Sequence, residues 1–275
     1  MTHQEESPAT AAGHYIEANG VNIYYEEYGS GEPLLLIHGD TLNHGMWEQH
    51  VPEFARHFRV IAPDTRAHGR TKNSGAILSY RLLADDLVAL IQALGLVRPL
   101  VCGYSGGGQI ALEMGMYYPG LVKAYVVGGA SHRWSPQYYE VVRGMGIDGP
   151  GAVDFERMER DDSGMVKRLQ EEHDRYQGEG YWRTHMQELS YIFWETVNCT
   201  VEDLQRIVDP VLLQIGDHDR FYTVEENVEM YRAIPGAELA VAPGSGHGFP
   251  FSNAKTLTNL ALDFLLRNTA GSKQG

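Results

Sequence analysis

The sequence is poor in positive charge and has no long apolar run. Its 22 lysines and arginines are outnumbered by 36 aspartates and glutamates, which gives a formal net charge of -14 at pH 7. No basic run is present that could neutralise a phosphate backbone. No apolar stretch approaches the roughly 20 residues needed to cross a bilayer. We therefore expect a soluble protein without nucleic-acid or membrane partners.

Cysteine is also scarce, because the chain has only Cys102 and Cys199. Cys102 lies in an apolar run typical of a buried strand, so we expect no disulfide and a cytoplasmic location. Residues 1–13 lack the basic start and apolar core of a signal peptide. We expect them to form a disordered tail.

The rest of the chain alternates short apolar runs with longer helical patterns. Two strand-like stretches, 14–18 and 21–28, are joined by Asn19-Gly20, a pair that favours a tight hairpin turn. The alternation that follows is typical of a mostly parallel sheet with helices on both faces. Further strands are expected at 33–37, 60–62, 99–103, 122–127, 211–215 and 238–241, and helices at 82–94, 109–118 and 257–265.

The alternation stops between residues 131 and 203, where charged helical segments carry many large aromatic residues. We interpret this segment as a helical lid inserted into a single α/β core formed by residues 14–130 and 204–270. An individual aromatic residue belongs to a core more often than to a substrate site. The candidates for substrate contact, from the lid and the core, are Tyr104, Trp134, Tyr138, Trp182, Trp194 and Phe249.

Ser105 lies in the sequence Gly103-Tyr104-Ser105-Gly106-Gly107, between an apolar strand pattern and a helical pattern. A serine at a sharp strand-to-helix turn has a strained backbone and an exposed hydroxyl, and such a turn needs small residues two positions before and after it. With 31 glycines in the chain, a glycine-rich turn without chemistry is the alternative. The strand and helix on either side favour a nucleophile.

A serine nucleophile needs a histidine base, which in turn needs an orienting carboxylate. His247 follows the last expected strand, in a loop before the final helix. The acid is expected after the strand at 211–215, where Asp217 and Asp219 both occur. We favour Asp219, because a residue deeper in the loop can turn toward the histidine, and we assign Asp217 to the turn.

These residues resemble the α/β-hydrolase superfamily over nearly the whole chain. Ile37-His38-Gly39-Asp40 is similar to its oxyanion loop, and the segment from Asp64 to Thr71 is similar to its Asp-x-Arg-Gly-His-Gly-x-Ser turn. The resemblance implies an α/β-hydrolase fold, with the backbone amides of Asp40 and Gly106 as oxyanion donors. It also supports Asp219, since the alternative position for the acid in this superfamily, near Gly129, has no carboxylate.

Two positions depart from that pattern. Ala67 replaces a glycine of the turn, and Asp40 places a carboxylate beside the expected oxyanion hole, where it would oppose the negative charge formed there. Asp40 either selects a substrate that donates a hydrogen bond or caps the following turn through Thr41 or Leu42.

We therefore expect an enzyme that hydrolyses a carboxylic ester, a lactone or a thioester of a small, largely apolar substrate through an acyl-enzyme on Ser105, with no metal and no organic cofactor. The alternatives are a carbon–carbon bond hydrolase, a proline iminopeptidase-like amidase, and a hydrolase-fold receptor with little turnover. For the amidase, acidic residues of the lid could hold a substrate amine: Glu156, Glu159, Asp161 and Asp162. The expected partner is a small-molecule substrate, and assembly into a homo-oligomer is left open.

Overall fold

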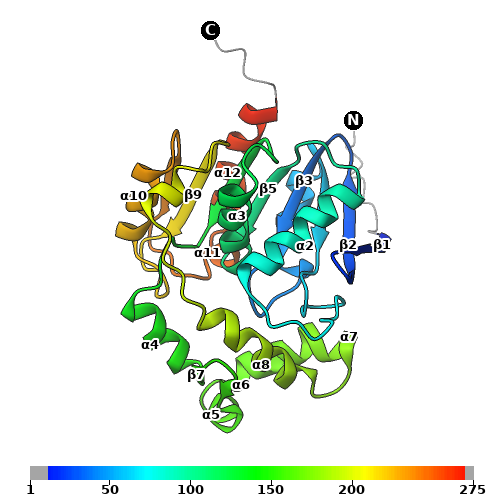
Figure 1. The fold of residues 1–275 in the computed structure, drawn as a ribbon, viewed down its shortest axis with the longest axis vertical. Coiled ribbons are helices and arrows are strands. Elements are labelled where there is room, and N and C mark those ends of the chain that lie inside the picture. Colours follow the sequence, from blue (N-terminus) through cyan, green and yellow to red (C-terminus); the bar gives the residue numbers. More distant parts are fainter. Residues whose placement is uncertain (1–11, 270–275) are drawn as a thin grey trace, which may run out of the picture.

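The computed structural model describes residues 12–269, and its centre is an eight-stranded sheet (Figure 1). The strand order is β1-β2-β4-β3-β5-β6-β9-β10, and β2 runs antiparallel to both of its neighbours while every other pairing is parallel. The strands are β1 (Ala12–Ala18), β2 (Val21–Gly29), β3 (Glu32–Ile37), β4 (Phe58–Pro63), β5 (Leu100–Tyr104), β6 (Ala124–Gly128), β9 (Val211–Gly216) and β10 (Glu238–Ala242).

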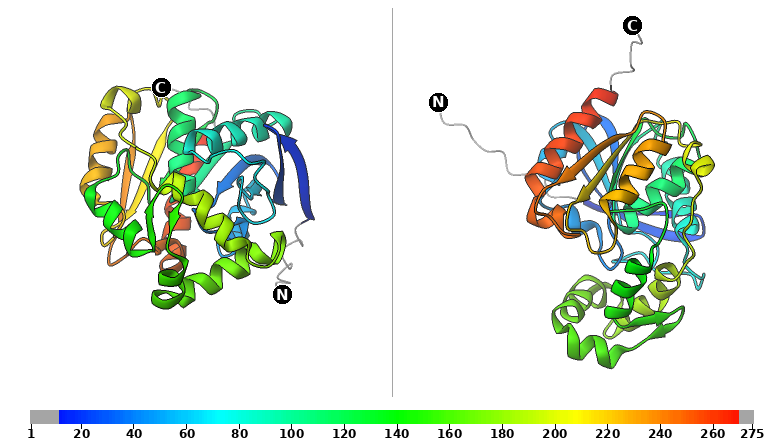
Figure 2. Two further views of the ribbon diagram at one scale, coloured as in Figure 1. Left: turned by 60° about the horizontal axis from the view of Figure 1, so that its bottom comes forward. Right: turned by 90° about the vertical axis from the view of Figure 1, so that its left-hand side faces the viewer.

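The sheet is covered on both faces because successive residues of its strands point to opposite faces and are apolar on each face. In β3, Leu34 and Leu36 point into one core, and Leu35 and Ile37 point into the other. Figure 2 shows helices on both sides of the sheet. One face packs against α2 (Tyr80–Ala93), α3 (Gly106–Tyr117) and α10 (Val224–Ala233), and the other against α1 (Val51–Phe54), α11 (Phe249–Ser252) and α12 (Ala254–Thr269).

The expected mostly parallel sheet flanked by helices is confirmed, although several elements begin or end a few residues from the expected positions. Most of the expected tail, residues 1–13, lies outside the described residues, but Ala12 and Gly13 belong to β1, where they pair with Glu27 and Glu26. Helix α3 begins at Gly106 and not at the expected Gln109, because three consecutive glycines hid its first turn.

Between β6 and β9 the chain leaves the sheet and forms a helical insertion, defined here as residues 136–193. It lies below the sheet in Figure 1, at the carboxyl ends of the parallel strands. Arg133 and Asn198 form an antiparallel bridge where the chain leaves and returns. The elements of the insertion are α4 (Pro136–Gly144), β7 (Ile147–Gly149), β8 (Ala152–Val153), α5 (Phe155–Asp161), α6 (Ser163–Leu169), the π-helix η2 (Gln170–Asp174), α7 (Arg175–Gln177) and α8 (Tyr181–Phe193).

Two short helices lie outside the insertion and the sheet layers. The 3-10 helix η1 (His44–Trp47) follows β3. Helix α9 (Val201–Leu204) follows the bridge residue Asn198 and contacts α10. Within residues 12–269, no helix combines the length and apolar character needed to span a membrane.

Candidate active site

Ser105 is the residue between β5 and α3, and its backbone has a conformation that residues other than glycine rarely adopt. Its φ is 54° and its ψ is -119°. The turn is tight: a Cβ on Gly103 would lie 2.1 Å from the Gly107 carbonyl oxygen, and a Cβ on Gly107 would lie 2.2 Å from the Ile37 carbonyl oxygen. The two glycines are therefore required by the close backbone approach on either side of the serine.

Three side chains from separate loops form a continuous hydrogen-bonded chain. His247 Nε2 lies 3.0 Å from Ser105 Oγ, and His247 Nδ1 lies 2.7 Å from Asp219 Oδ2. The other oxygen of Asp219 accepts hydrogen bonds from the backbone amides of Phe221 and Tyr222. The carboxylate is thus held by its own loop, and it favours the tautomer of His247 that leaves Nε2 free to accept the serine proton.

The structure also separates the two aspartates that follow β9. Asp219 is buried and faces His247, whereas Asp217 accepts a 2.9 Å hydrogen bond from the backbone amide of Ser245. Asp217 therefore ties its loop to the loop that carries His247. Among the described residues, the Asp217 carboxylate accepts no hydrogen bond from within its own turn, so its role differs from the expected one of turn former.

The segment after β3 brings the backbone of Gly39 against Ser105, because a Cβ on Gly39 would lie 3.1 Å from the Ser105 Cβ. The buried His38 holds this segment: its Nδ1 lies 2.8 Å from the Gly39 carbonyl oxygen, and its Nε2 accepts a 3.0 Å hydrogen bond from the Thr65 amide. Burial lowers the pKa of His38. A neutral imidazole with its proton on Nδ1 satisfies both contacts.

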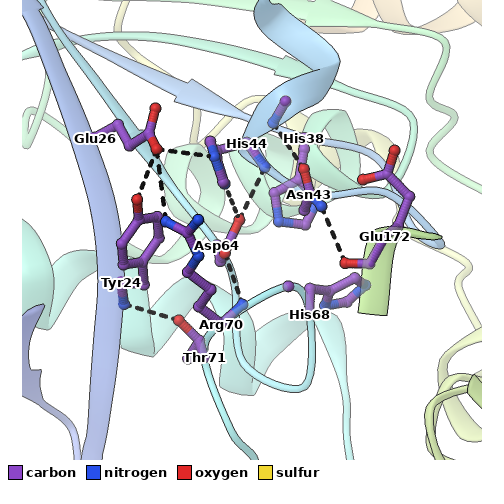
Figure 3. Close-up of polar contacts among 12 residues, drawn as sticks. Tyr24, Glu26, His38, Asn43, His44, Asp64, His68, Arg70, Thr71 and Glu172 are labelled. Carbon is purple, nitrogen blue, oxygen red and sulfur yellow. Dashed lines mark hydrogen bonds and ion pairs between the residues drawn. The ribbon is translucent and has the colours of Figure 1, made fainter. Parts of the chain in front are cut away.

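The turn from Asp64 to Thr71 lies beside this segment and is anchored by the Asp64 carboxylate (Figure 3). Asp64 accepts hydrogen bonds from the His44 backbone and side chain and from the Arg70 amide. His44 Nε2 also lies 3.2 Å from Glu26. Although burial alone would lower it, the pKa of His44 is raised to about 9 by these two carboxylates. The imidazolium therefore bridges η1, β2 and the end of β4.

Ala67 shows why this turn normally contains glycine. Its φ is 70°, in the left-handed region, and its side chain is fully buried. The neighbouring Arg66 makes a bidentate ion pair with Asp86 of α2 at 2.7 Å. The substitution of glycine by alanine is thus accommodated without loss of the turn.

Asp40 does not cap the following turn, which corrects one of the two expectations for it. The amide of Leu42 bonds to the Gly39 carbonyl oxygen, while Asp40 Oδ2 accepts a 2.7 Å hydrogen bond from the hydroxyl of Tyr80. The carboxyl group of Asp40 lies against Gly106, where a Cβ would meet Oδ1 at 2.2 Å. Burial raises the pKa of Asp40 to about 6, and the Tyr80 hydrogen bond and the nearby His247 oppose this shift.

A cavity of about 270 Å³ lies between Ser105 and the helical insertion. Its floor is formed by Asp40, Ser105 and His247, and the insertion contributes the opposite wall. The lining side chains are mostly apolar or aromatic, and they include Thr41, Tyr138, Met145, Met165, Arg168, Phe193, Phe221 and Tyr222. The site can therefore enclose a small apolar group next to the serine.

Tyr138 is the one residue among the six expected substrate contacts that lines this cavity. Trp134 stacks behind it, with ring centroids 4.3 Å apart. Tyr104 and Phe249 pack against each other beneath His247, in the core on the α12 side of the sheet. Trp182 is fully buried against Phe155, and Trp194, which directly follows the insertion, packs on Tyr139 of α4. These five expectations are wrong because large aromatic side chains were used to fill the two cores.

A more open hollow adjoins the cavity and shares Met145, Met165, Phe221 and His247 with it. Asp161 and Asp162 line this outer hollow, but Asp162 caps the start of α6 by accepting a hydrogen bond from the Met165 amide. Glu159 contacts Arg183 on the surface of the insertion. None of the four acidic side chains considered for an amine-binding role lines the cavity beside Ser105.

Four buried histidines form a cluster where the insertion meets the core, and no pattern in the sequence indicates it. His38 and His68 come from the core, and His173 and His185 come from the insertion. The ring centroids of His173 and His185 are 3.8 Å apart, and those of His68 and His185 are 4.7 Å apart. Burial lowers the pKa of each of the four, which favours neutral rings.

Within residues 12–269, no group of three or more histidine, cysteine, aspartate or glutamate side chains is arranged to hold a metal ion. Several nitrogens of the histidine cluster make structural contacts instead, while His68 Nε2 and His185 Nε2 have no hydrogen-bond partner among the described residues. His173 accepts from the Gly69 amide, and His185 Nδ1 lies 3.0 Å from the Ala67 carbonyl oxygen. The cluster thus joins the turn at 64–71 to the insertion.

Residues 34–259 match the model of the alpha/beta hydrolase family. The chain is 27% identical to AB hydrolase superfamily protein YisY of Bacillus subtilis over 92% of this chain and 98% of that protein. It is 28% identical to a non-heme haloperoxidase of Rhodococcus erythropolis, over 90% of this chain and 97% of that protein. The solved structure of Est816, described as an N-acyl homoserine lactone degrading enzyme, superposes with a TM-score of 0.68 at 26% identity, covering 91% of this chain and all of that one. The chain belongs to the alpha/beta hydrolase family.

Proposed function

We propose that the protein hydrolyses a carboxylic ester or a lactone of a small, largely apolar substrate through an acyl-enzyme on Ser105. The observation that carries this proposal is the hydrogen-bonded chain from Ser105 through His247 to Asp219, in which Ser105 and His247 line a mostly apolar cavity. A serine hydroxyl becomes an effective nucleophile when an oriented histidine removes its proton.

In this mechanism, Ser105 Oγ attacks the carbonyl carbon while His247 takes the proton. The negative charge that forms on the carbonyl oxygen is stabilised by two backbone amides: that of Asp40, in the segment after β3, and that of Gly106, the first residue of α3. His247 then gives its proton to the leaving oxygen. It next activates a water molecule that releases the acyl group, and Asp219 holds the imidazole in one tautomer throughout.

The helical insertion has the role of a lid in this proposal. It supplies Tyr138, Met145, Met165 and Phe193 to the cavity, so it covers the reacting groups and excludes water from the substrate. The similarity to a lactone-degrading enzyme supports lactones as well as open-chain esters.

The proposal is tested with p-nitrophenyl esters of increasing acyl length and with a panel of lactones. We expect turnover of short acyl chains that the cavity can enclose, and loss of at least about 10⁴-fold in kcat for Ser105→Ala. Asp263→Asn, an exposed substitution on α12, serves as the matched control and should retain full activity. Turnover of these esters by Ser105→Ala at the rate of the unmodified protein would overturn the assignment.

A further inference from the structure

Asp40 brings a carboxyl group into a cavity that is otherwise lined mostly by apolar and aromatic side chains. A buried carboxyl group is costly unless each of its oxygens has a hydrogen-bond partner or the group is protonated. Its contacts in the absence of substrate therefore indicate what a substrate must provide.

The two oxygens of Asp40 differ in their surroundings. Oδ2 accepts the hydrogen bond from Tyr80, whose ring is almost completely buried and cannot turn toward the substrate. Oδ1 receives no hydrogen bond from any residue within 12–269, and Asp40 lines the cavity beside Ser105. Oδ1 is therefore the oxygen available to a substrate.

The position of Asp40 also limits where on the substrate such a partner can lie. Its carboxyl group rests against Gly106, the residue that directly follows Ser105. In the proposed mechanism, the backbone amide of the same Asp40 contacts the carbonyl oxygen. A substrate group that reaches Oδ1 must then be attached within one or two bonds of the scissile carbonyl carbon.

We propose that Asp40, held by Tyr80, selects esters or lactones that carry a hydroxyl group on the carbon next to the scissile carbonyl. This inference rests on the proposed function and names its substrate class. The hydroxyl donates its hydrogen to Oδ1 of Asp40. A substrate without a donor at this position displaces water from Oδ1 and leaves the oxygen unpaired, which weakens its binding and its transition state.

A neutral hydroxyl fits the site better than an ammonium group. Arg168 also lines the cavity, and its positive charge disfavours a second cation there. The other carboxylate of the site, Asp219, is already occupied by His247 and by two backbone amides. One carboxyl oxygen therefore remains for the substrate, which matches one hydroxyl donor.

The experiment compares kcat/KM for four esters that differ at a single substituent: ethyl mandelate, ethyl phenylacetate, ethyl 2-methoxy-2-phenylacetate and ethyl phenylglycinate. The methoxy ester keeps the oxygen but removes the donor, and the phenylglycine ester carries an amine. We expect ethyl mandelate to be preferred over the methoxy ester by about 10²-fold or more. In Asp40→Ala, this ratio should fall to within a few fold of one, because no carboxyl oxygen remains to accept from the hydroxyl group.

Two further measurements separate this inference from the proposed function and from simple misfolding. Tyr80→Phe should reduce the mandelate-to-methoxy ratio to a value between those of the unmodified protein and Asp40→Ala. It removes the hydrogen bond that holds Oδ2 of Asp40 but leaves the carboxyl group in place. Asp40→Asn should unfold at the temperature of the unmodified protein, and the exposed control Asp263→Asn should keep both the basal activity and the mandelate-to-methoxy ratio. Acylation of the unmodified protein by p-nitrophenyl acetate tests the proposed function separately. An unchanged mandelate-to-methoxy ratio in Asp40→Ala would overturn the inference, and so would a preference of the unmodified protein for the phenylglycine ester.

Discussion

Asp217 and Asp219 are two residues apart, yet the structure gives them different tasks. We expect Asp219→Asn to lower kcat by about 10³-fold or more, because an asparagine cannot stabilise the imidazolium form of His247 or select its tautomer. Asp217→Asn should stay within about tenfold of the unmodified protein, because its amide oxygen can still accept from Ser245. Steady-state ester hydrolysis by the two variants at pH 7.5 is the measurement.

The result would contradict the assignment if Asp217→Asn lost more activity than Asp219→Asn. Equal unfolding temperatures for the two variants would show that the difference in kcat comes from the site and not from stability.

At the scale of single residues, the sequence predicted the meeting of Ser105, Asp219 and His247, because each follows a strand that ends at the same edge of a parallel sheet. It could not predict the contact between Asp40 and Tyr80, which are 40 positions apart. It also misassigned Trp182 and Phe249, since an aromatic residue that fills a core has the same sequence pattern as one that lines a pocket.

At the scale of elements, the turn around Ser105 depends on backbone contacts that leave no room for a side chain. We expect Gly107→Ala to destabilise the fold by about 3 kcal/mol or more, because its methyl group would overlap the Ile37 carbonyl oxygen. Gly144→Ala, where the added methyl meets nothing within 4 Å, should change stability by less than about 1 kcal/mol. Urea unfolding of the two variants compares them directly, and equal losses would contradict the packing of this turn.

The turn from Asp64 to Thr71 is attached to α2 by the buried ion pair of Arg66 and Asp86. We expect Arg66→Ala to cost about 3 to 5 kcal/mol of unfolding free energy, because it leaves Asp86 buried without its partner. Arg59→Ala breaks a partly exposed pair with Glu27 and should cost about 1 kcal/mol or less. Denaturant titrations give both values, and a small loss for Arg66→Ala would show that Asp86 finds another partner.

Most elements were predicted from the sequence because the strands are apolar and bounded by turn residues, and α2 has a regular helical pattern. The first turn of α3 was not, because Gly106, Gly107 and Gly108 have poor helix propensity and are helical here through packing between β3 and β6. The pairing of Arg133 with Asn198 was also not predictable, since it joins two irregular segments 65 positions apart.

At the scale of the whole molecule, the histidine cluster makes the junction of the insertion and the core sensitive to acid. Burial lowers the pKa of His173 from 6.5 to about 4, and it lowers the pKa of His68 and His185 as well. The unfolded chain therefore binds these protons at a higher pH than the folded chain does. The stability is complete above about pH 6.5 and is lost as the pH falls from there toward 4, by about 1.4 kcal/mol per pH unit for each histidine.

Measurement of the unfolding free energy between pH 5 and pH 7 tests this expectation. His185→Gln should reduce the slope of the unfolding free energy against pH by up to about 1.4 kcal/mol per pH unit, whatever its effect on stability at pH 7. Other groups contribute in or near this window. Burial raises the pKa of Asp40 to about 6 and that of Glu113 to about 7, so their contributions to stability fall as the pH rises and oppose that of the cluster. His44, with its pKa raised to about 9, loses its contribution as the pH rises from about 6.5 to 9, and Glu26, with its pKa lowered to about 2, loses its contribution as the pH falls from about 4.5 to 2. The difference between the two proteins isolates the histidine, so an unchanged pH dependence in His185→Gln would contradict the neutral, buried state of the cluster.

The central claim is that Ser105 is an activated nucleophile, and covalent labelling tests it most directly. A fluorophosphonate forms a phosphorus–oxygen bond with an activated serine and releases fluoride. Intact-mass and peptide mass spectrometry should show a single phosphonyl group per chain, located on Ser105, and none on the Ser105→Ala protein. Labelling at another residue, or equal labelling of Ser105→Ala, would contradict the account.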